Sequence, residues 1–508
     1  MRRTVKALAS VAAIALIVVP VSVQPTMAGA AAKAKCASAK HAGGDWPSYG
    51  HDLSNTRTQS QEKVIGTDNV LDLAPVWTNS IVNVGAGGGF QSTPVVAEGC
   101  VYLTTNTGWI FALNADSGGL VWKQSFGGAQ GSLGGLFAPS VVDGVLYVNM
   151  DVPEKPYVAA FDAQTGDVLW KSDPATKEKT SFTNASAVVF DGLVFMGISG
   201  AEGGDSRPGG YAIFDADNGK LLTRVHSVPD ADYKKGYAGG SIWATAVVDQ
   251  EMNYLYVGTG QPSSPTKEHQ HTNAIVKIDV DRSRKTFGAI VDAYKGIPET
   301  YVPGLQNQPV CQQFGHDTPA AGACLNQDID FGASPNLFRD ERGNLMVGEY
   351  QKAGVYHAVY ADTMQQAWTA VLSPLLGPAY LANAASTAYD GKHIIGVGSF
   401  PGQMFGLNKT TGGYDWVAPV ADGVQYNPIA TANGVAYTTD TKGFLDAYDA
   451  VAGTPLLARP MSADTGEGCA NLAGGAAIAR NTIYAICDTG SAGGGWIIAY
   501  QVPQAKGR

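Results

Sequence analysis

A short motif that recurs along the chain constrains its fold more than any other feature. Alternating apolar residues are followed by Ala-x-Asp-x-x-Thr-Gly, then by three residues and a Trp, as in Ala160 to Trp170. The alternation predicts a strand, the Asp side chain caps the turn, and the Gly supplies the positive φ of a tight hairpin. Each copy therefore predicts two strands joined by a short turn.

The motif is found eight times, with varying completeness. The copies are Ala112–Trp122, Ala160–Trp170, Ile213–Gly219, Val276–Arg282, Val359–Trp368, Gly406–Trp416, Ala447–Gly453 and Ile498–Tyr500. A small sheet cannot bury both faces alone, so repeated sheets close into a ring that leaves only short edges. The large Trp ring can fill the wedge between neighbouring sheets. We predict an all-β fold, an eight-bladed β-propeller of four-stranded antiparallel blades, with a β-sandwich or open solenoid as the alternative.

The last copy stops at its strand and lacks an outer partner. The segment from Leu73 to Asn79, which contains Trp77, is predicted to complete that blade and close the circle. The composition agrees with many short strands and tight turns, because 63 Gly and 22 Tyr accompany only 15% charged residues. An apolar content of 45% supports a large core in a chain of 508 residues.

The N-terminus is typical of a secretory signal. Arg2, Arg3 and Lys6 precede an apolar run, and Thr26-Met27-Ala28 offers a small-residue cleavage site. We predict a signal peptide over 1–28, a flexible arm over 29–44, the propeller over 45–503 and a tail over 504–508, in a secreted or extracytoplasmic protein. Losing the three basic residues takes the formal net charge from −10 to −13, which argues against nucleic acid as a partner. No other apolar stretch is long enough to span a membrane.

Six cysteines in an exported chain predict disulfides. Cys311 pairs with Cys324 around one loop and Cys469 with Cys487 around another. Cys36 and Cys100 could tie the N-terminal arm to the first blade, or Cys36 could be free. Cys-x-x-Cys-His does not occur, so no c-type haem is expected.

Four segments depart from the repeat, and we expect function there. Ser199-Gly200-Ala201-Glu202 combines small residues, which let a backbone approach a ligand, with a carboxylate that can bind a hard cation. Its alternative is a long loop with an exposed Glu. Trp243, at the inner end of a blade, could form one wall of a slot for a planar ring, or could be another Trp between blades.

The other two segments offer polar groups. Gln261 follows a strand end, and its amide oxygen could join the shell of a cation; a plain turn is the alternative. Asp330, beside the loop of Cys311 and Cys324, is a candidate general base. Lys352, taken to begin a strand, could stabilise charge on a reduced ligand. A solvated turn is the alternative for both.

Together these motifs identify a resemblance that covers nearly all of the chain after the signal. The opening Asp45-Trp46-Pro47-Ser48-Tyr49-Gly50-His51-Asp52, the triplet Asn55-Thr56-Arg57 and the run Gln91-Ser92-Thr93-Pro94 precede the segments described above. The set resembles the pyrroloquinoline quinone-dependent alcohol dehydrogenases, most closely their polyvinyl alcohol dehydrogenase-like branch.

The resemblance implies the following roles. Pyrroloquinoline quinone and Ca²⁺ would be the cofactors, and Asp330 would be the catalytic base that takes the hydroxyl proton of an alcohol, with Lys352 beside the quinone oxygens. The cofactor contacts would be Gln91, Thr183, Ser199, Gly200, Ala201, Trp243 and Lys352, and the cation ligands would be Glu202, Gln261 and Asp330. The substrate would be a primary or secondary alcohol, such as polyvinyl alcohol or a polyol. A separate acceptor, such as a cytochrome c or a quinone, would take the electrons.

Two positions depart from the family pattern. Gln261 stands where the family has Asn or Asp, and Gly134-Gly135-Leu136-Phe137 stands where an Arg would clamp a cofactor carboxylate. These departures keep open a second interpretation, a cofactor-free secreted propeller that acts as a binding or assembly scaffold. A hydrolase or lyase is a third, although no paired carboxylates or nucleophile–base arrangement stands out. His269 and His271 could bind a metal, but we expect a solvated loop.

Overall fold

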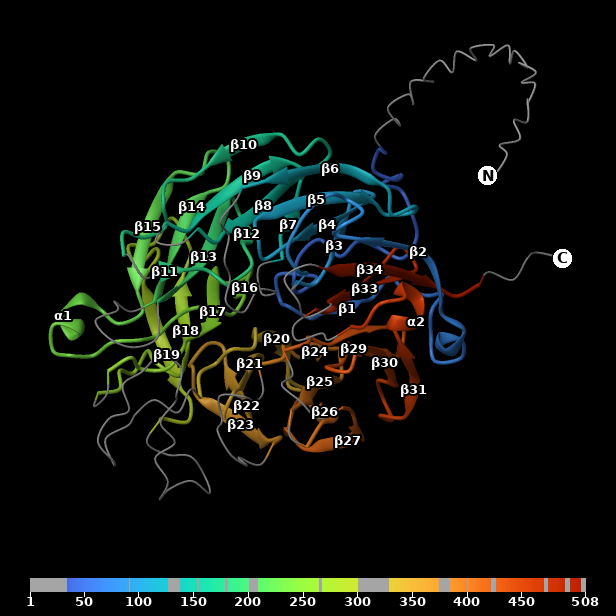
Figure 1. Cartoon of the computed structure of the whole chain (residues 1–508). Helices are drawn as coiled ribbons and strands as arrows, with labels where there is room; N and C mark the ends of the chain where they lie inside the picture. Colours follow the sequence, from blue (N-terminus) through green and yellow to red (C-terminus); the bar gives the residue numbers. More distant parts are fainter. Residues whose placement is uncertain are drawn as a thin grey trace, which may run out of the picture. The chain divides into compact units, whose positions relative to one another are not determined.

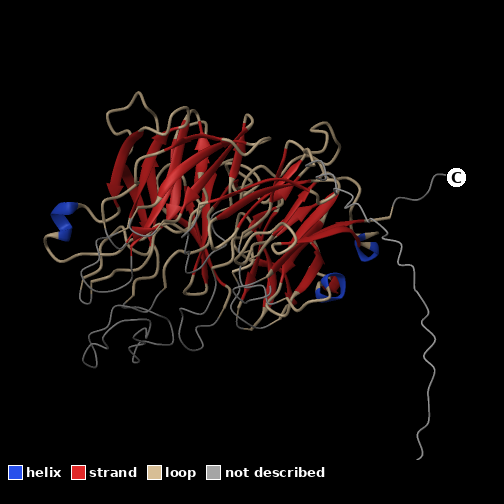
Figure 2. Cartoon of the chain, turned by 45° about the horizontal axis from the view of Figure 1, so that its top comes forward, coloured by secondary structure: helices blue, strands red, loops and turns tan. Residues whose placement is uncertain are grey.

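The computed structural model describes residues 34–90, 92–126, 138–152, 155–178, 181–200, 209–264, 267–299, 329–373, 384–399, 401–421, 426–469, 474–488 and 494–503. They form eight sheets of mainly antiparallel strands around a common centre (Figure 1). Strands dominate, and the helical turns in the described ranges are short and peripheral (Figure 2). The prediction of an all-β, eight-bladed propeller is confirmed.

Four blades come from the first half of the chain. Blade 1 contains β3 (Val95–Ala97), β4 (Cys100–Thr104), β5 (Trp109–Asn114) and β6 (Leu120–Ser125). Blade 2 contains β7 (Ser140–Val142), β8 (Val145–Met150), β9 (Tyr157–Asp162) and β10 (Val168–Lys171). Blade 3 contains β12 (Val188–Phe190), β13 (Leu193–Gly200), β14 (Gly210–Asp215) and β15 (Leu221–His226), with β11 (Ser181–Phe182) paired to β13. Blade 4 contains β16 (Val247–Asp249), β17 (Tyr254–Gly258), β18 (Ala274–Asp279) and β19 (Ile290–Lys295).

The remaining blades complete the ring. Blade 5 contains β20 (Asn336–Arg339), β21 (Leu345–Gln351), β22 (Val355–Tyr360) and β23 (Gln366–Val371). Blade 6 contains β24 (Ala388–Tyr389), β25 (His393–Gly398), β26 (Gln403–Asn408) and β27 (Tyr414–Pro419). Blade 7 contains β28 (Ala430–Ala432), β29 (Val435–Thr439), β30 (Phe444–Asp449) and β31 (Pro455–Pro460). Blade 8 contains β32 (Ala476–Ala479), β33 (Thr482–Asp488), β34 (Gly495–Gln501) and, from the other end of the chain, β2 (Ala74–Ser80). The other elements are β1 (Thr58–Gln59), η1 (Val70–Asp72), α1 (Asp230–Tyr233) and α2 (Ser462–Thr465).

The recurring motif forms the hairpin between the third and fourth strands of a blade. In blade 2, Asp162 Oδ1 accepts the backbone N–H groups of Gln164 (3.0 Å) and Thr165 (2.8 Å), and Gly166 has φ +77°. The Asp cap and the left-handed Gly are the two features expected from the sequence. The turn chemistry therefore fixes the hairpin locally, before any contact between blades.

Each motif Trp docks on the next blade. Trp122 of blade 1 donates its indole N–H to the carbonyl oxygen of Ala163 (2.9 Å), and its ring lies against Gly166 of blade 2. The same indole-to-carbonyl bond is made by Trp77, Trp170, Trp368 and Trp416. These rings fill the wedges between blades, as predicted.

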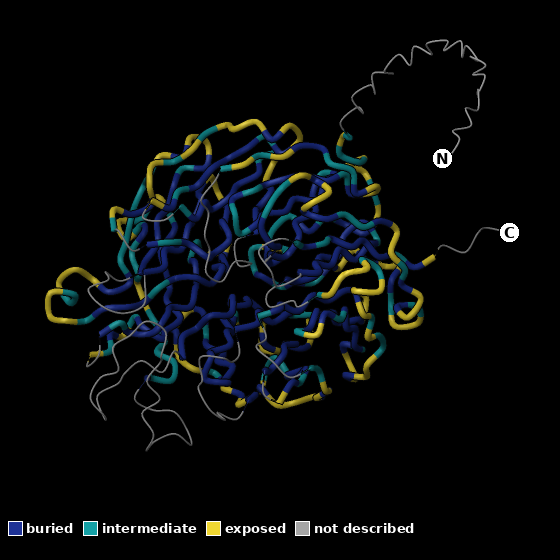
Figure 3. The backbone as a smooth tube through the Cα atoms, in the orientation of Figure 1, coloured by how far each residue is buried: buried dark blue, intermediate teal, exposed yellow. Residues whose placement is uncertain are grey.

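The core lies between the blades. Inner and middle strands are buried, whereas fourth strands and turns carry most of the exposed residues (Figure 3). The first strands of successive blades pack against one another around the centre, and β32 of blade 8 contacts β3 of blade 1. The circle is closed by hydrogen bonds between β2 and β34, as predicted from Trp77.

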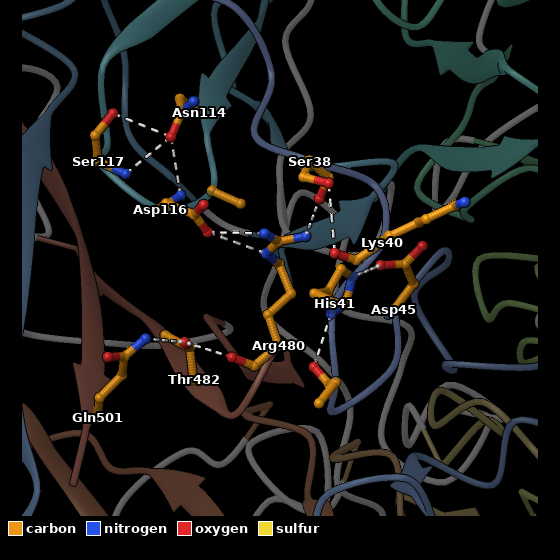
Figure 4. A network of polar contacts seen from close by, with 12 residues as sticks. Ser38, Lys40, His41, Asp45, Asn114, Asp116, Ser117, Arg480, Thr482 and Gln501 are labelled. Atoms are coloured by element: carbon orange, nitrogen blue, oxygen red, sulfur yellow. Dashed lines mark hydrogen bonds and ion pairs between the residues drawn. The ribbon is translucent and has the colours of Figure 1, made fainter. Parts of the chain in front are cut away.

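The N-terminal arm reinforces this closure. Arg480 of blade 8 pairs with Asp116 of blade 1 (2.8 Å) and donates to the carbonyl oxygen of Ser38 (2.8 Å), so one guanidinium joins the arm to both blades (Figure 4). The Cys36–Cys100 disulfide attaches the arm to blade 1. That bridge and the Cys469–Cys487 bridge confirm two of the predicted pairs. Cys311 and Cys324 lie outside the described residues, as does the predicted signal peptide.

After the arm, residues 44–59, which we name the belt, pass the first strands of nearly every blade. Backbone hydrogen bonds join Gly44 to Arg480, Trp46 to Val96, Pro47 to Val141, Leu53 to Val248, Ser54 to Leu337, Thr56 to Tyr389 and Arg57 to Thr431. The fully buried Arg57 donates to the carbonyl oxygens of Ile429 (2.6 Å) and Tyr49, and lies 4.6 Å from the Tyr49 ring. The belt thus connects blades that are far apart in sequence.

Hydroxyl groups link the inner ends of neighbouring blades. Thr245 Oγ1 accepts the Ser186 N–H (3.1 Å), Ser334 Oγ accepts the Thr245 N–H (2.9 Å), and Ser386 Oγ accepts the Ser334 N–H (2.9 Å). Tyr49 of the belt bonds to Ser386 (2.9 Å). These bonds fix the segments on which the candidate site residues stand. Among the described helices, none is long and apolar enough to cross a membrane.

Candidate active site

The predicted site residues gather at one end of the blades. Trp243 and Asp330 precede the first strands β16 and β20, whereas Gln261 and Lys352 follow the second strands β17 and β21. Because adjacent strands are antiparallel, the start of a first strand and the end of a second strand lie at the same edge of a sheet. Lys352 lies in the tight turn between β21 and β22, so the expectation that it begins a strand is wrong.

Asp330 is the centre of the site. Its Oδ2 accepts the indole N–H of Trp243 (2.6 Å), and its Oδ1 lies 2.9 Å from Nζ of Lys352. Nζ of Lys352 also lies 5.0 Å from the centroid of the Trp243 ring. The exposed fractions of Trp243, Asp330 and Lys352 are 5%, 2% and 4%. A carboxylate this deeply buried requires a charged or hydrogen-bonding partner, and it has both.

Backbone contacts hold Asp330 at this place. The carbonyl oxygen of Asp330 accepts the Lys352 N–H (3.0 Å), and the Phe331 N–H donates to the carbonyl oxygen of Thr259 (3.3 Å). Gly332 lies directly against the indole, since a Cβ there would be 2.1 Å from Cζ2 of Trp243. The Asp-Phe-Gly sequence therefore supplies a carboxylate and the close approach that the Trp ring requires.

A second set of predicted residues lies where blades 3 and 4 meet. The Thr183 hydroxyl donates to the carbonyl oxygen of Gly197 (2.9 Å), and the Ser199 hydroxyl donates to that of Ile242 (3.4 Å). The Gly200 N–H donates to Ser241 Oγ (3.1 Å), two residues before Trp243. Ser199 and Gly200 are the last two residues of β13.

Gln261 lies beside both sets. It is 7% exposed, and its backbone carbonyl oxygen accepts the Gly240 N–H (3.1 Å). Its neighbour Gly260 donates to the carbonyl oxygen of Ser241 (2.7 Å), and Thr259 contacts Phe331. The segment therefore runs between the loops that carry Trp243 and Asp330. The predicted residues Gln91, Ala201 and Glu202, and the segment from Gly134 to Phe137, lie outside the described residues.

Buried polar atoms without partners show where a ligand could be held. Asn184 Oδ1, next to Thr183, and Asp151 Oδ2 have no hydrogen-bond partner among the residues the structure describes. Burial raises the pKa of Asp151, although its Oδ1 accepts the Thr183 N–H (3.2 Å). Unpaired buried oxygens suit a cation or an N–H donor. The flat Trp243 ring beside the Lys352 ammonium suits a planar ligand with anionic groups, and the oxygens of Asp151 and Asn184 suit a cation.

Several contributors to the site carry no recognisable sequence signal. Gly332 belongs to the motif that marks Asp330, but the motif does not indicate its contact with Trp243. Asp151 contacts Thr183 from another blade, so neither residue alone indicates the other. Gln351, next to Lys352, bonds to segments far away in sequence. Finding such residues from sequence would require knowledge of which loops meet.

The histidine pair is not a solvated loop, contrary to expectation. His269 is 8% exposed, its ring packs edge-on against His271 at 4.8 Å, and its Nε2 lies 3.4 Å from Asp232. Burial lowers the pKa of both histidines. Within the described ranges, no group of three or more His, Cys, Asp or Glu residues could hold a metal ion. The pair is packed into the loop that bears Gln261.

Comparison with known proteins shows which proteins this chain is similar to. Residues 68–298 match the family model described as outer membrane protein assembly factor BamB. The quinohemoprotein alcohol dehydrogenase ADH IIB of Pseudomonas putida is 30% identical over 260 residues, which are 45% of this chain and 36% of that protein. The chain is related to the quinoprotein alcohol dehydrogenases. The resemblance drawn from the motifs is thereby confirmed.

Two further comparisons extend this relationship. The polyvinylalcohol dehydrogenase of Sphingopyxis sp. (strain 113P3) is 27% identical over 351 residues, which are 62% of this chain and 51% of that protein. The crystal structure of quinohemoprotein alcohol dehydrogenase from Comamonas testosteroni superposes with a TM-score of 0.69 at 18% identity, covering 91% of this chain and 81% of that one. That superposition supports the quinoprotein-type fold alone. The matches span about one-third to one-half of the length of these curated relatives.

Proposed function

We propose that this chain is a pyrroloquinoline quinone-dependent alcohol dehydrogenase-like oxidoreductase. The proposal depends on one observation above all, the buried Asp330 carboxylate held between the Trp243 indole N–H and the Lys352 ammonium. Such a carboxylate can accept a proton from a substrate hydroxyl. The adjacent ammonium can stabilise negative charge that develops nearby.

The residues divide the work between proton transfer and positioning. Asp330 takes the hydroxyl proton of the alcohol, the Trp243 N–H holds one carboxylate oxygen in place, and Lys352 stabilises the developing oxyanion. Gly332 leaves the Trp243 ring room beside the Asp330 loop. Burial excludes water from these groups, which strengthens their electrostatic interactions.

Two cofactors belong to this proposal. Pyrroloquinoline quinone, when bound, supplies the acceptor for the hydrogen and electrons removed from the alcohol carbon. Its contacts would be Gln91, Thr183, Ser199, Gly200, Ala201, Trp243 and Lys352. A Ca²⁺ ion would be held by Glu202, Gln261 and Asp330, since carboxylate and amide oxygens are the ligands that Ca²⁺ prefers.

The test is an Asp330→Asn substitution in protein reconstituted with the quinone and Ca²⁺. Dye-coupled alcohol oxidation should fall by roughly 10²–10⁴-fold, the usual contribution of a general base. Asp68→Asn, at an exposed position in the same chain, is the matched control and should retain the wild-type rate. Unchanged oxidation by Asp330→Asn would overturn the proposal.

The proposal also covers the substrate, the electron acceptor and the location of the protein. We take the substrate to be a primary or secondary alcohol, with polyvinyl alcohol and polyols as specific candidates, because polyvinylalcohol dehydrogenase is among the relatives. The electrons would pass to a separate cytochrome c or quinone. Two disulfides and the N-terminal signal pattern support secretion or an extracytoplasmic location. Rates with short alcohols, polyols and the polymer would rank the substrates.

A second candidate function is a cofactor-free binding or assembly scaffold. The match of residues 68–298 to the BamB family model favours it. Equilibrium dialysis of the purified protein against the quinone and Ca²⁺ separates the two functions. Saturable binding that Trp243→Phe weakens supports the dehydrogenase, whereas absence of binding supports the scaffold.

A further inference from the structure

Gln351, the last residue of β21, is fully buried beside the proposed site and uses its whole side-chain amide. Its Nε2 donates to the carbonyl oxygens of Ile329 (2.7 Å) and Ile297 (2.9 Å), and its Oε1 accepts the Ile297 N–H (3.0 Å). Ile329 immediately precedes Asp330, and Ile297 follows the last strand of blade 4. One amide therefore fixes the segment that leaves blade 4 and the segment that enters the site.

His357 orients this amide. Its Nε2 lies 3.0 Å from Gln351 Oε1, and burial lowers its pKa to about 3, so the imidazole is neutral at ordinary pH. A neutral imidazole has one N–H, and the amide oxygen can only accept, so Nε2 carries the hydrogen. The Phe331 ring packs edge-on against the imidazole at 5.2 Å. His357 thus contacts both the amide and the residue that follows Asp330.

The chain of contacts continues to the outer strands. The Tyr294 hydroxyl, on β19, donates to Gln366 Oε1 on β23 (2.8 Å) and lies 3.0 Å from His357 Nδ1. A series of side chains therefore leads from the outside of blades 4 and 5 to the backbone before Asp330. Gly296 makes room for it, since a Cβ there would be 2.5 Å from the Phe331 ring and 2.9 Å from Gln351 Oε1.

We propose that Gln351, oriented by His357, is the positioning residue that sets Asp330 against Trp243 and Lys352. This inference rests on the proposed role of Asp330 as the base, and it deepens that proposal. Hydrogen bonds hold the backbone at three consecutive residues. Gln351 donates to the Ile329 carbonyl oxygen, the Lys352 N–H donates to that of Asp330, and the Phe331 N–H donates to that of Thr259. Loss of the Gln351 amide releases the first of these. A displacement of about 1 Å at a reacting group costs roughly 100-fold in rate.

The first test uses the full chain without cofactor. In protein labelled with ¹⁵N only at Trp, the indole signal that disappears in Trp243→Phe reports the Trp243–Asp330 hydrogen bond. Gln351→Met, which keeps the length but removes the amide, should move this signal toward its position in Asp330→Asn. The other indole signals should stay, which shows that the fold is intact. An unmoved Trp243 signal would overturn the inference.

The second test measures turnover with quinone and Ca²⁺ present. Gln351→Met should lower kcat about 10- to 100-fold with little change in KM, because the base is misplaced while the substrate pocket remains. Gln351→Glu should recover activity at low pH, where its neutral acid can still donate to a carbonyl, and lose it as the acid ionises. A purely structural role would not produce this pH dependence. Equal kcat at all pH values for both variants would contradict the inference.

A milder variant covers the case in which Gln351→Met does not fold. Tyr294→Phe removes one hydroxyl at the outer end of the chain and should shift the Trp243 signal in the same direction by less. Tyr414→Phe is the matched control, because the Tyr414 hydroxyl bonds to the carbonyl oxygen of Val371 (2.8 Å) outside this chain of contacts. If wild-type protein shows no oxidation but the Trp243 signal still responds to Gln351, the positioning stands and the dehydrogenase proposal fails. If wild-type protein oxidises alcohols but Gln351→Met leaves the Trp243 signal unchanged, the dehydrogenase proposal stands and the positioning inference fails.

Discussion

Asp330 and Glu349 are neighbouring carboxyl groups with opposite surroundings. Asp330 is paired with an ammonium and an indole N–H, whereas neither oxygen of Glu349 has a hydrogen-bond partner within the described part of the chain. Glu349 is fully buried, faces His357 across β21 and β22, and lies against Gly258, where a Cβ would be 1.9 Å from its Oε1. Burial, followed by the charge of Asp330, holds the pKa of Glu349 well above its usual range. Glu349 is therefore the neutral member of the two.

This raised pKa predicts a stability that falls with pH. Between the pKa of an unfolded Glu, about 4.3, and its higher value in the fold, the folded protein binds the extra proton. The free energy of unfolding therefore decreases in this window by up to about 1.4 kcal/mol per pH unit. Glu349→Gln should equal wild type near pH 4 and exceed it increasingly toward neutral pH in denaturant titrations.

The control for this measurement is Glu341→Gln, at an exposed position of the same blade. It should preserve the wild-type dependence on pH. A Glu349→Gln protein that loses stability with pH as steeply as wild type would show that Glu349 is ionised in the fold.

At the scale of the element, the repeated contact is a Trp ring on a turn glycine. Gly412 of blade 6 has φ +70°, and a Cβ there would be 2.3 Å from Cε3 of Trp368 of blade 5. The glycine therefore serves both the left-handed turn and the packing between blades. Gly343, with φ +85° and open space around it, serves only a turn.

These two glycines separate backbone strain from packing. Gly343→Ala should cost about 1 kcal/mol of unfolding free energy, the strain of a left-handed alanine. Gly412→Ala should cost roughly 1–3 kcal/mol more, because the methyl group must displace the indole. Thermal unfolding of the two variants side by side measures the difference. Equal losses would mean that the Trp368 ring moves freely.

The elements that sequence predicts well are those whose information is local. The Asp, the Gly and the Trp of a motif lie within about ten residues. The turn, the strands and the Trp contact between blades could therefore all be predicted from one short segment. The candidate site was predictable only in part. Trp243, Asp330 and Lys352 were found from motifs, but their mutual contacts depend on loops from two blades. Gln351 bonds to Ile297 across 54 positions, and no local pattern marks such a pair.

For the whole molecule, stability depends on how the ring is closed. The Cys36–Cys100 bridge spans 64 residues and the Cys469–Cys487 bridge spans 18. A bridge that closes a longer loop removes more entropy from the unfolded chain, by about 1 kcal/mol for these two lengths. Replacing the Cys36–Cys100 pair by alanine should therefore lower Tm more than replacing the Cys469–Cys487 pair, in parallel calorimetric scans. The opposite order would indicate that the arm contributes little to the closure.

The pairing of β2 with β34 has a consequence for synthesis. Residues of β2 and the belt emerge from the ribosome long before blades 7 and 8 are synthesised, so the strands that pair with these early segments do not yet exist. Until the C-terminal strands emerge, β2 carries an unsatisfied edge that could join another chain. We therefore expect a chaperone or another temporary partner to bind that edge while the rest of the chain is being translated.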